Sequence, residues 1–390
     1  MICHFITSEY PPEPGGVSDY TRMVAEALGS AGDEVHVWCP EANGETPYAS
    51  GVFVHRDLGG LAARDLRRAG RLLDRFDGPR RLLVQWVPHG YGYRAMNLPF
   101  CLWLWSRARR QGDRIELIVH EPFLSFGEGS WKQDCVAFVH RLMTVVLLNA
   151  ASRVWTTIPA WEKRLRPYAL GRRNLFHWLP VASNIPIVDD PTGVILIRSR
   201  YAGAGGAEGS IVGHFGAYDR NTADLLLRSI PVLLQNGRKP SVLLLGRGSA
   251  SMRDQLIREH PGIADDVHAT GELDAVDLSK HLRACDLMLQ PYIDGVSSRR
   301  TTIMAQLSLG LPVITTAGNL TEPLWAESRA VALTPAGDVS EMVEATNRLL
   351  GDEGERKRLA AAARSLYLNL FDIGHSVAAL RAQPLTHGAK

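Results

Sequence analysis

The chain has 390 residues, of which 45% are hydrophobic and 22% are charged, and its formal net charge is +2. A chain of this length is too long to form a single hydrophobic core of ordinary size, and it predicts two domains of about 180 to 200 residues each. The composition is that of a soluble globular protein, and a net charge so close to zero gives no overall attraction for nucleic acid, so nucleic acid is not an expected partner.

Cysteine usage and the first residues favour a cytoplasmic protein. The five cysteines are scattered without CxxC spacing, as in a reduced compartment. The opening MICHFITSEYPPEP lacks the basic start and the long apolar run of a signal peptide. The longest apolar stretches, residues 98–105 and 142–148, fall well short of the roughly 20 residues that span a bilayer.

The first half of the chain alternates strand-like and helix-like segments. MICHFIT, EVHVWCP, VFVHRD, LLVQWVP, IELIVHEP and SRVWTT read as strands, with helices expected over residues 17–28, 61–76, 97–111 and 131–150. Alternating βα units of this size predict a parallel, doubly wound sheet. Ligands bind at the carboxyl ends of the strands in such sheets, so the residues after each strand are the first candidates for a site.

Two such positions are Gly15 with Gly16, before the first helix, and His120, after the fifth strand. A glycine pair allows the backbone to approach a ligand closely, and the helix that follows would point its N-terminus at an anion. Glycine pairs also occur in simple turns, and a lone histidine at a strand end is commonly structural. The residues alone leave both alternatives open.

Residues 188–209 have the weakest pattern and include AGAGGAEG, so we expect the hinge between the domains here. After it, SIVGHFG, SVLLLGRGS, DVHATGEL, DLMLQPY and LPVITT supply the strands of a second doubly wound domain. Gly246 and Gly248 form only a fragment of a dinucleotide fingerprint that lacks its third glycine, so a bound NAD and a P-loop are both discounted. The last segments, from EMVEATNRLL onward, are helical.

The stretch from Asp286 to Ala317 carries the strongest chemical signal. An apolar strand leads through Asp294 and Gly295 into a polar loop with Arg299 and Arg300, and a helix follows. Helix N-termini favour anions, and guanidinium groups grip phosphate oxygens in a forked geometry. The pattern predicts a ligand that bears phosphate.

LRACDLMLQPYIDG followed by GLPVITT, together with the opening Pro-x-x-Gly-Gly-Val-x-x-Tyr, resembles glycosyltransferase family 4, whose members bind nucleotide sugars and have the GT-B fold. The resemblance implies an α/β protein of two Rossmann-like lobes with a cleft between them. We expect the N-terminal, acceptor-side lobe over residues 1–190 and the donor-side lobe over 191–371. Residues 372–390 would form a helix that crosses back to the first lobe.

The resemblance also implies a set of site residues. His120 would lie beside the reacting carbon of the sugar, and Arg220 would bind the diphosphate and stabilise the departing charge. Together with the polar loop argued above, it gives a donor-binding set of Gly15, Gly16, His214, Gly216, Arg220, Gly246, Leu273, Asp294, Ser297, Ser298, Arg299, Arg300 and Thr301. The chain departs from the family where two glutamates usually stand, because these positions fall on Ser297 and Ala305, and His214 replaces an arginine.

The implied reaction transfers a sugar from a nucleoside-diphosphate sugar to a hydroxyl acceptor, with retention of configuration and assistance from the leaving phosphate. No Asp-x-Asp motif occurs and arginine can stabilise the diphosphate, so neither a metal nor a cofactor is expected. The acceptor is unidentified: a saccharide, a lipid-linked saccharide or a small molecule. The arginine-rich helix over 61–76 and the cluster of Trp103, Trp105, Arg107, Arg109 and Arg110 would suit peripheral contact with an anionic membrane, or are simply solvated helix faces.

Two rival functions stay open at this stage. A sugar-nucleotide 2-epimerase of the same fold would use His120, Glu121 and Asp294 for proton abstraction and would need no acceptor. A non-catalytic relative would have lost activity with the changes at Ser297 and Ala305.

Overall fold

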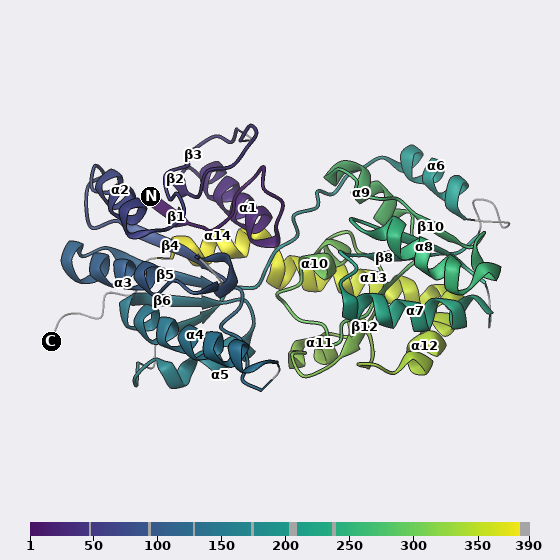
Figure 1. Cartoon of the computed structure of the whole chain (residues 1–390). Coiled ribbons are helices and arrows are strands. Elements are labelled where there is room, and N and C mark those ends of the chain that lie inside the picture. Colours follow the sequence, from purple (N-terminus) through teal and green to yellow (C-terminus); the bar gives the residue numbers. More distant parts are fainter. Residues whose placement is uncertain are drawn as a thin grey trace. The chain divides into compact units, whose positions relative to one another are not determined.

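The computed structural model describes residues 1–46, 48–92, 95–127, 129–172, 175–202, 209–235 and 239–382. The chain divides into two compact units (Figure 1): unit 1 is residues 1–181 with 373–390, and unit 2 is residues 182–372.

Unit 1 contains a sheet of seven parallel strands in the order β3-β2-β1-β4-β5-β6-β7. Its strands are β1 (Ile2–Ile6), β2 (Glu34–Trp38), β3 (Val52–His55), β4 (Arg81–Trp86), β5 (Arg114–Val119), β6 (Ala151–Thr156) and β7 (Phe176–Trp178). The central strands are buried on both faces because helices cover both, as is usual for parallel sheets.

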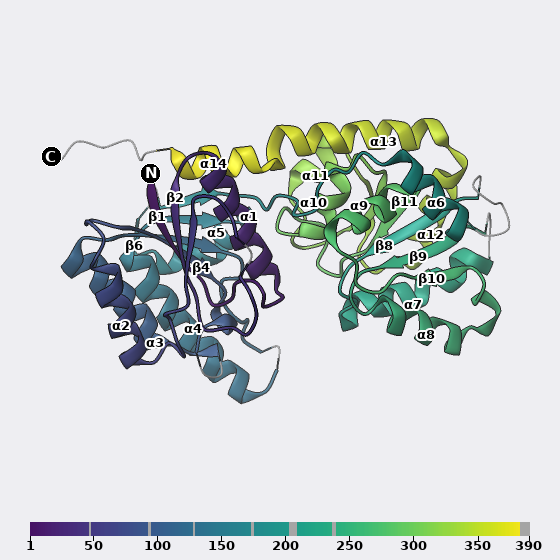
Figure 2. The same cartoon turned by 90° about the horizontal axis from the view of Figure 1, so that it is seen from above.

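The helices of unit 1 are α1 (Gly16–Ser30), α2 (Ala63–Leu73), α3 (Leu98–Ser106), α4 (Trp131–Ala150), α5 (Pro159–Leu165) and α14 (Ile373–Arg381). A π-helical segment, Arg107–Gln111, extends α3, and single 3-10 turns lie at Pro88–Gly90 and Arg166–Tyr168. Within this unit, α14 packs beside α1 on one face of the sheet, and α2, α3 and α4 lie on the other (Figure 2). The last described helix, α14, thus belongs to unit 1 although it follows unit 2 in the sequence.

Unit 2 contains six parallel strands in the order β10-β9-β8-β11-β12-β13. These are β8 (Ile211–Phe215), β9 (Ser241–Leu245), β10 (Val267–Ala269), β11 (Leu287–Gln290), β12 (Val313–Ala317) and β13 (Ala332–Pro335). The helices are α6 (Pro191–Tyr201), α7 (Arg220–Gln235), α8 (Ser249–Glu259), α9 (Ala275–Arg283), α10 (Thr301–Ser308), α11 (Pro323–Ser328), α12 (Val339–Gly351) and α13 (Glu353–Leu366). A 3-10 turn lies at Pro261–Ile263, and a π-helical segment, Tyr367–Phe371, extends α13.

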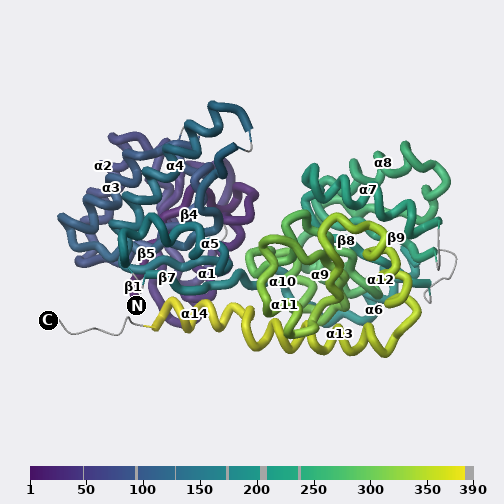
Figure 3. Tube along the Cα trace, turned by 90° about the horizontal axis from the view of Figure 1, so that it is seen from below, coloured from purple at the N-terminus to yellow at the C-terminus, as the bar shows by residue number. Residues whose placement is uncertain are grey.

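Two hydrophobic cores lie on the two faces of the second sheet. One packs residues of α6, α9, α10, α11 and α13, and the other packs residues of α7, α8, α12 and α13. The course of these helices can be followed along the chain trace in Figure 3. Two doubly wound parallel sheets are what the alternating pattern of the sequence predicts, so the fold class is confirmed. No helix in the described ranges is both long and apolar enough to cross a bilayer.

The division between the units differs from the expected hinge. It falls between Val181 and Ala182, whereas the domain boundary was expected at residue 190 and the hinge over 188–209. Residues 191–201 are not a linker but form α6, which Asp190 caps by accepting a hydrogen bond from the Gly193 N–H at 2.8 Å. Arg198 ties this helix to unit 2, because it donates to the Ala284 carbonyl at 2.7 Å and pairs with Asp286 at 3.0 Å. Residues 203–208 lie outside the described part of the chain.

Candidate functional site

The strand order of unit 2 places a candidate site at the carboxyl ends of its strands. The order reverses between β8 and β11, and the loops after these two strands flank this point, where ligands bind in open α/β sheets. Every predicted site residue of unit 2 lies on β8 or on a segment that follows β8, β9, β10 or β11.

The loop after β11 holds two arginines against one carboxylate. Arg300 Nη2 lies 2.6 Å from Asp294 Oδ1, and Arg299 Nη2 pairs with the other oxygen of the same side chain. The Arg300 guanidinium also lies over the Tyr292 ring, 4.8 Å from its centroid. The loop therefore holds two guanidinium groups against a single Asp294 carboxylate. Asp294 is engaged through both oxygens, so in this structure it is not an uncommitted carboxylate that could replace the missing family glutamate.

A close approach fixes the turn of this loop. Gly295 adopts a φ of +85°, and a Cβ at this position would lie 2.7 Å from the Gly318 Cα. The Leu320 N–H donates to the Asp294 carbonyl at 2.9 Å, and the Val296 N–H donates to the Thr316 carbonyl at 2.8 Å. Only glycine fits here, and the turn is held on the chain that follows β12.

Glu322 is a functional candidate that the sequence did not single out. It is buried, and its carboxylate accepts hydrogen bonds from the Ser298 N–H at 3.0 Å, from the Ser298 hydroxyl and from the Trp325 indole at 2.8 Å. Glu322 thus fixes the residue that precedes both loop arginines. The only sequence signal was a carboxylate before Pro323 at the start of a helix, a common capping pattern.

The family positions without glutamate are both enclosed. Ser297 is fully buried, and its hydroxyl has no hydrogen-bond partner among the described residues. Ala305 is also fully buried and belongs to the hydrophobic core beneath α10. Thr301, which is half-buried, begins that helix.

The loop after β8 leads into α7 through an acidic cap. Asp219 accepts hydrogen bonds from the Asn221 N–H at 3.0 Å and from the Thr222 hydroxyl at 2.9 Å. Burial raises the pKa of Asp219, but these hydrogen bonds and the positive charge of Arg300 outweigh it, so the pKa lies below its ordinary value. The electrostatic influence of Arg300 indicates that the loops after β8 and β11 lie near each other. Arg220, the first residue of α7, is exposed.

His214, which the resemblance places in the donor-binding set beside Arg220, has an apolar setting. It is buried in β8 against the Tyr218 ring, at 4.9 Å between centroids, and neither ring nitrogen has a partner among the described residues. Burial lowers the pKa of His214 to about 3, so the side chain is neutral at pH 7. A neutral buried imidazole cannot supply the charge of the arginine it replaces.

The ends of β9 and β10 complete this edge of the sheet. Gly246 has a φ of +101°, and a Cβ there would lie 2.7 Å from the Gly216 carbonyl oxygen, so a glycine is needed to bring the two loops together. Arg247 pairs with Glu272 at 2.8 Å, and Leu273 is half-buried against the core.

In unit 1, the glycine loop approaches a carboxylate of its own chain. The Val17 and Ser18 N–H groups at the start of α1 donate to Glu9 Oε1 at 3.1 and 3.0 Å. A Cβ on Gly15 would overlap the Glu9 carboxylate, whereas one on Gly16 would meet open space. Glu9 therefore occupies the helix N-terminus that the sequence predicted as an anion site.

His120 lies at the end of β5 and is held on several sides. Its Nε2 lies 2.7 Å from Gln85 Oε1, its ring packs edge-on against Tyr20 at 4.9 Å, and its carbonyl accepts from the Trp161 indole at 2.7 Å. Burial lowers the pKa of His120 to about 4, so the imidazole is neutral at pH 7. The bond to Gln85 favours a proton on Nε2, which leaves Nδ1 as an acceptor.

The basic surfaces of unit 1 are only partly as expected. Arg107 is buried and pairs with Asp113 at 2.6 Å and Asp74 at 2.8 Å, so it cannot contact a membrane. The outer face of α2 does present exposed arginines, namely Arg64, Arg67, Arg68 and Arg71.

Sequence comparison assigns residues 209–352, which lie within unit 2, to a known family. They match the model described as Glycosyl transferases group 1. Phosphatidyl-myo-inositol mannosyltransferase of Mycobacterium leprae (strain TN) is 24% identical over 368 residues, which cover 90% of this chain and 87% of that protein.

Solved structures with the same fold include two glycosyltransferases of the GT-B fold. Sucrose-phosphate synthase from Thermosynechococcus elongatus superposes with a TM-score of 0.73 at 16% identity, over 97% of each chain. Anabaena Alr3699/HepE in complex with UDP-glucose gives a TM-score of 0.67 at 17% identity, over 97% of this chain and 98% of that one. The chain has the GT-B fold.

Proposed function

We propose, from the premise that residues 209–352 form a glycosyl transferases group 1 domain, that this protein transfers a hexose from a nucleoside-diphosphate sugar to a hydroxyl acceptor. The observation that carries the proposal is the pair of arginines on the loop after β11, which lies inside this domain at the switch point of its sheet. The UDP-glucose bound by Alr3699/HepE, a protein of the same fold, supports a nucleotide-sugar donor.

Arg299 and Arg300 bind the diphosphate in this proposal, with Arg220 as a further cation from α7. Guanidinium groups bind phosphate oxygens in pairs and stabilise the negative charge that develops on the departing diphosphate. The diphosphate takes the place that the Asp294 carboxylate holds in this structure. Gly216 and Gly246, where the loops after β8 and β9 approach each other, would line the donor site, and Ser298 positions the two arginines through its bonds to Glu322.

His120 acts on the acceptor side. Its neutral ring is fixed by Gln85, and its Nδ1 is able to accept a hydrogen bond from a sugar or acceptor hydroxyl. We propose retention of configuration, with the leaving phosphate taking the proton of the attacking hydroxyl, as the family resemblance implies. This chemistry needs no metal and no cofactor.

We place the protein in the cytoplasm, with peripheral contact to an anionic membrane through α2. The buried side of this helix holds Leu66, Ala69 and Leu73, and its arginines face outward. An anionic lipid surface attracts such arginines, and a lipid-linked acceptor would be presented there.

The test is turnover of a panel of nucleotide sugars by the purified full chain, followed by identification of the glycosylated product by mass spectrometry. Release of nucleoside diphosphate that depends on an added acceptor supports the proposal. Conversion of the donor sugar to an epimer without acceptor would instead favour the 2-epimerase. If no nucleotide sugar shifts the melting temperature, the chain is a non-catalytic relative.

A further inference from the structure

A cavity of about 510 Å³ lies at the amino-terminal edge of the sheet in unit 1. Ile2, Arg81 and Arg114, at the starts of β1, β4 and β5, line it, and the end of α14 contributes Arg381. Each strand rises about 3.3 Å per residue, so this edge is roughly 15 to 20 Å from the opposite edge that carries His120. The cavity is therefore separate from the candidate site of this unit.

The lining of the cavity is strongly cationic. Five arginines face it, Arg75, Arg80, Arg81, Arg114 and Arg381, against the two carboxylates of Asp77 and Glu116, and Arg381 also pairs with the buried Asp33 at 3.3 Å. Arg81 neutralises Glu116 in a forked pair at 2.7 and 2.8 Å, and the Glu116 carboxylate, which is 1% exposed, also accepts from the Trp155 indole at 2.9 Å.

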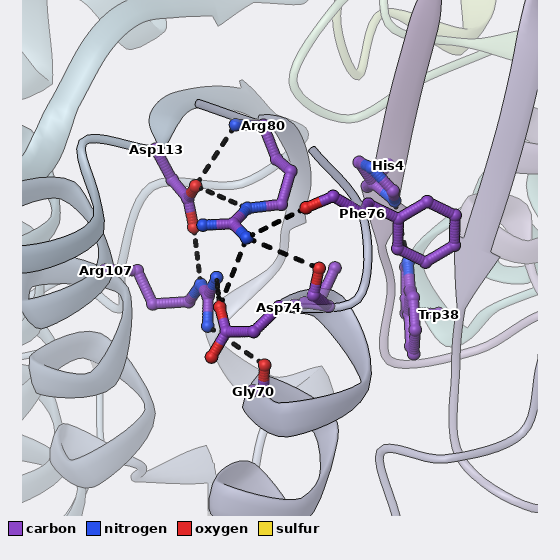
Figure 4. A network of polar contacts seen from close by, with 9 residues as sticks. His4, Trp38, Gly70, Asp74, Phe76, Arg80, Arg107 and Asp113 are labelled. Carbon is purple, nitrogen blue, oxygen red and sulfur yellow. Dashed lines mark hydrogen bonds and ion pairs between the residues drawn. The ribbon is translucent and has the colours of Figure 1, made fainter. Parts of the chain in front are cut away.

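A buried network neutralises Arg80 and makes one wall of the cavity rigid (Figure 4). Arg80 Nε lies 2.7 Å from the fully buried Asp113, which also holds Arg107, and Arg80 Nη1 donates to the Phe76 carbonyl at 3.2 Å. The Phe76 ring packs edge-on against His4 at 4.8 Å. The wall thus offers a fixed aromatic surface beside the cations.

Arg75 and Arg114 have no carboxylate within ion-pair distance among the described residues. Arg114 is half-buried, where an uncompensated charge is costly. The charges of Arg81 and Arg114 also reach the neighbouring Arg153: burial lowers the pKa of Arg153, Glu116 raises it, and these two arginines lower it further. Positive charge therefore exceeds negative charge at this edge.

We infer that this cavity binds the phosphate group of an anionic ligand, gripped by Arg114 and Arg75. Guanidinium groups bind phosphate in forked pairs, and an entering phosphate would supply the missing counter-charge. The Phe76 and His4 wall would pack against an uncharged part of the same ligand. The inference stands independently of the proposed glycosyl transfer, since it uses no residue of that site.

The experiment measures calorimetric binding of inorganic pyrophosphate to the full chain, with Arg299→Ala present throughout to weaken the other phosphate-binding loop. Adding Arg114→Ala should weaken pyrophosphate binding about tenfold or more. Adding Arg258→Ala, an exposed arginine of α8, should change nothing. Arg75→Ala replaces Arg114→Ala if the latter does not fold, because Arg75 is exposed.

A second arm uses sedimentation with vesicles that contain phosphatidic acid. Loss of binding with Arg114→Ala in either arm supports the inference and shows whether the phosphate comes from a soluble molecule or a lipid headgroup. Binding unchanged by Arg114→Ala and by Arg75→Ala in both arms would overturn it.

Discussion

The carboxyl-terminal edges of the two sheets differ in the charged groups that they carry. In unit 1 the N-terminus of α1 is already filled by the Glu9 carboxylate, and the nearby His120 is neutral at pH 7. In unit 2 the loop after β11 gathers Arg299 and Arg300 around a single Asp294. A glycine loop before a helix is thus not enough to define an anion site, because the chain can fill it with its own carboxylate.

This difference suggests that the two edges contact different parts of the ligands. The edge of unit 2 brings two guanidinium groups together, as the proposed diphosphate site requires, whereas the edge of unit 1 offers the neutral His120 as a hydrogen-bonding group. The predictions below test this contrast, beginning with the largest expected effect.

The burial of Ala305 in the hydrophobic core of unit 2 is tested by Ala305→Glu. Ala305 is fully buried in an apolar core, so a carboxylate there should cost about 3 to 5 kcal/mol of unfolding free energy, as for an unpaired buried charge. Denaturant unfolding measures the loss, and Ala305→Ser should lose far less. A variant that keeps its stability and binds a ribonucleotide donor about tenfold more tightly would show instead that this position opens to the ligand.

The neutral site of unit 1 is tested by His120→Ala. Turnover should fall about a hundredfold, the usual effect of removing a positioned proton-transfer or hydrogen-bonding group, while the donor dissociation constant changes little. His89→Ala, on the loop after β4, is the matched control. If the His120 variant melts much earlier and its folded fraction turns over normally, this histidine is structural.

Removal of charge from unit 2 should affect binding rather than folding. Arg299→Ala and Arg220→Ala should each weaken nucleoside-diphosphate binding by about 1.5 to 3 kcal/mol, the worth of a charge-assisted hydrogen bond. Calorimetric titration measures the change, with Arg258→Ala as control. Parent-like affinity in both variants would place the diphosphate elsewhere.

The buried histidine of unit 2 makes a pH-dependent contribution to stability. The pKa of His214 is about 3 in the folded chain and about 6.5 when unfolded. The unfolded chain therefore binds a proton first, and stability present above pH 6.5 is lost as the pH falls toward 3. At pH 5 this loss is about 2 kcal/mol. The difference in unfolding free energy between pH 7 and pH 5 should shrink by about this amount in His214→Phe. An unchanged difference would contradict the lowered pKa of His214 in the folded chain.

The smallest effect is expected from Glu9→Gln, which removes the negative charge at the N-terminus of α1 and keeps the side-chain shape. Unfolding free energy should fall by about 1 kcal/mol at low ionic strength and by less at high salt. Glu13→Gln, on the exposed part of the same loop, should be neutral. Equal effects of the two changes would mean that Glu9 does not act through the helix terminus.

Much of the fold could be predicted because βα alternation is a local property of the sequence. Most strands of both sheets follow from apolar runs, whereas the return of the last helix was expected only from the family resemblance. Helix α6 was missed because PTGVILIRSRY has no clear polar and apolar faces, and β13 was missed because ALTP is too short to form a pattern.

The site was less predictable because its contacts join segments far apart in the chain. The polar loop with its two arginines is visible in the sequence, but its pairing with Asp294 depends on the turn at Gly295. The hydrogen bond between Glu322 and Ser298 joins residues 24 positions apart, and no local sequence pattern predicts it. Ala305 marks a departure from the family in sequence, yet only packing shows that it is enclosed.

The clamp of two arginines on Asp294 has a consequence for the energetics of ligand entry. A diphosphate that binds there would replace an anion that is already in place, so the two guanidinium groups would need little reorientation. Part of the conformational entropy of the arginine side chains has already been lost during folding, and binding would not have to remove it again. For the same reason, the incoming ligand must bind the two arginines more strongly than the Asp294 carboxylate does. If the loop binds the diphosphate as proposed, an anion that binds the arginines no better than a single carboxylate would gain nothing by displacing Asp294, and the loop would discriminate against weak anions.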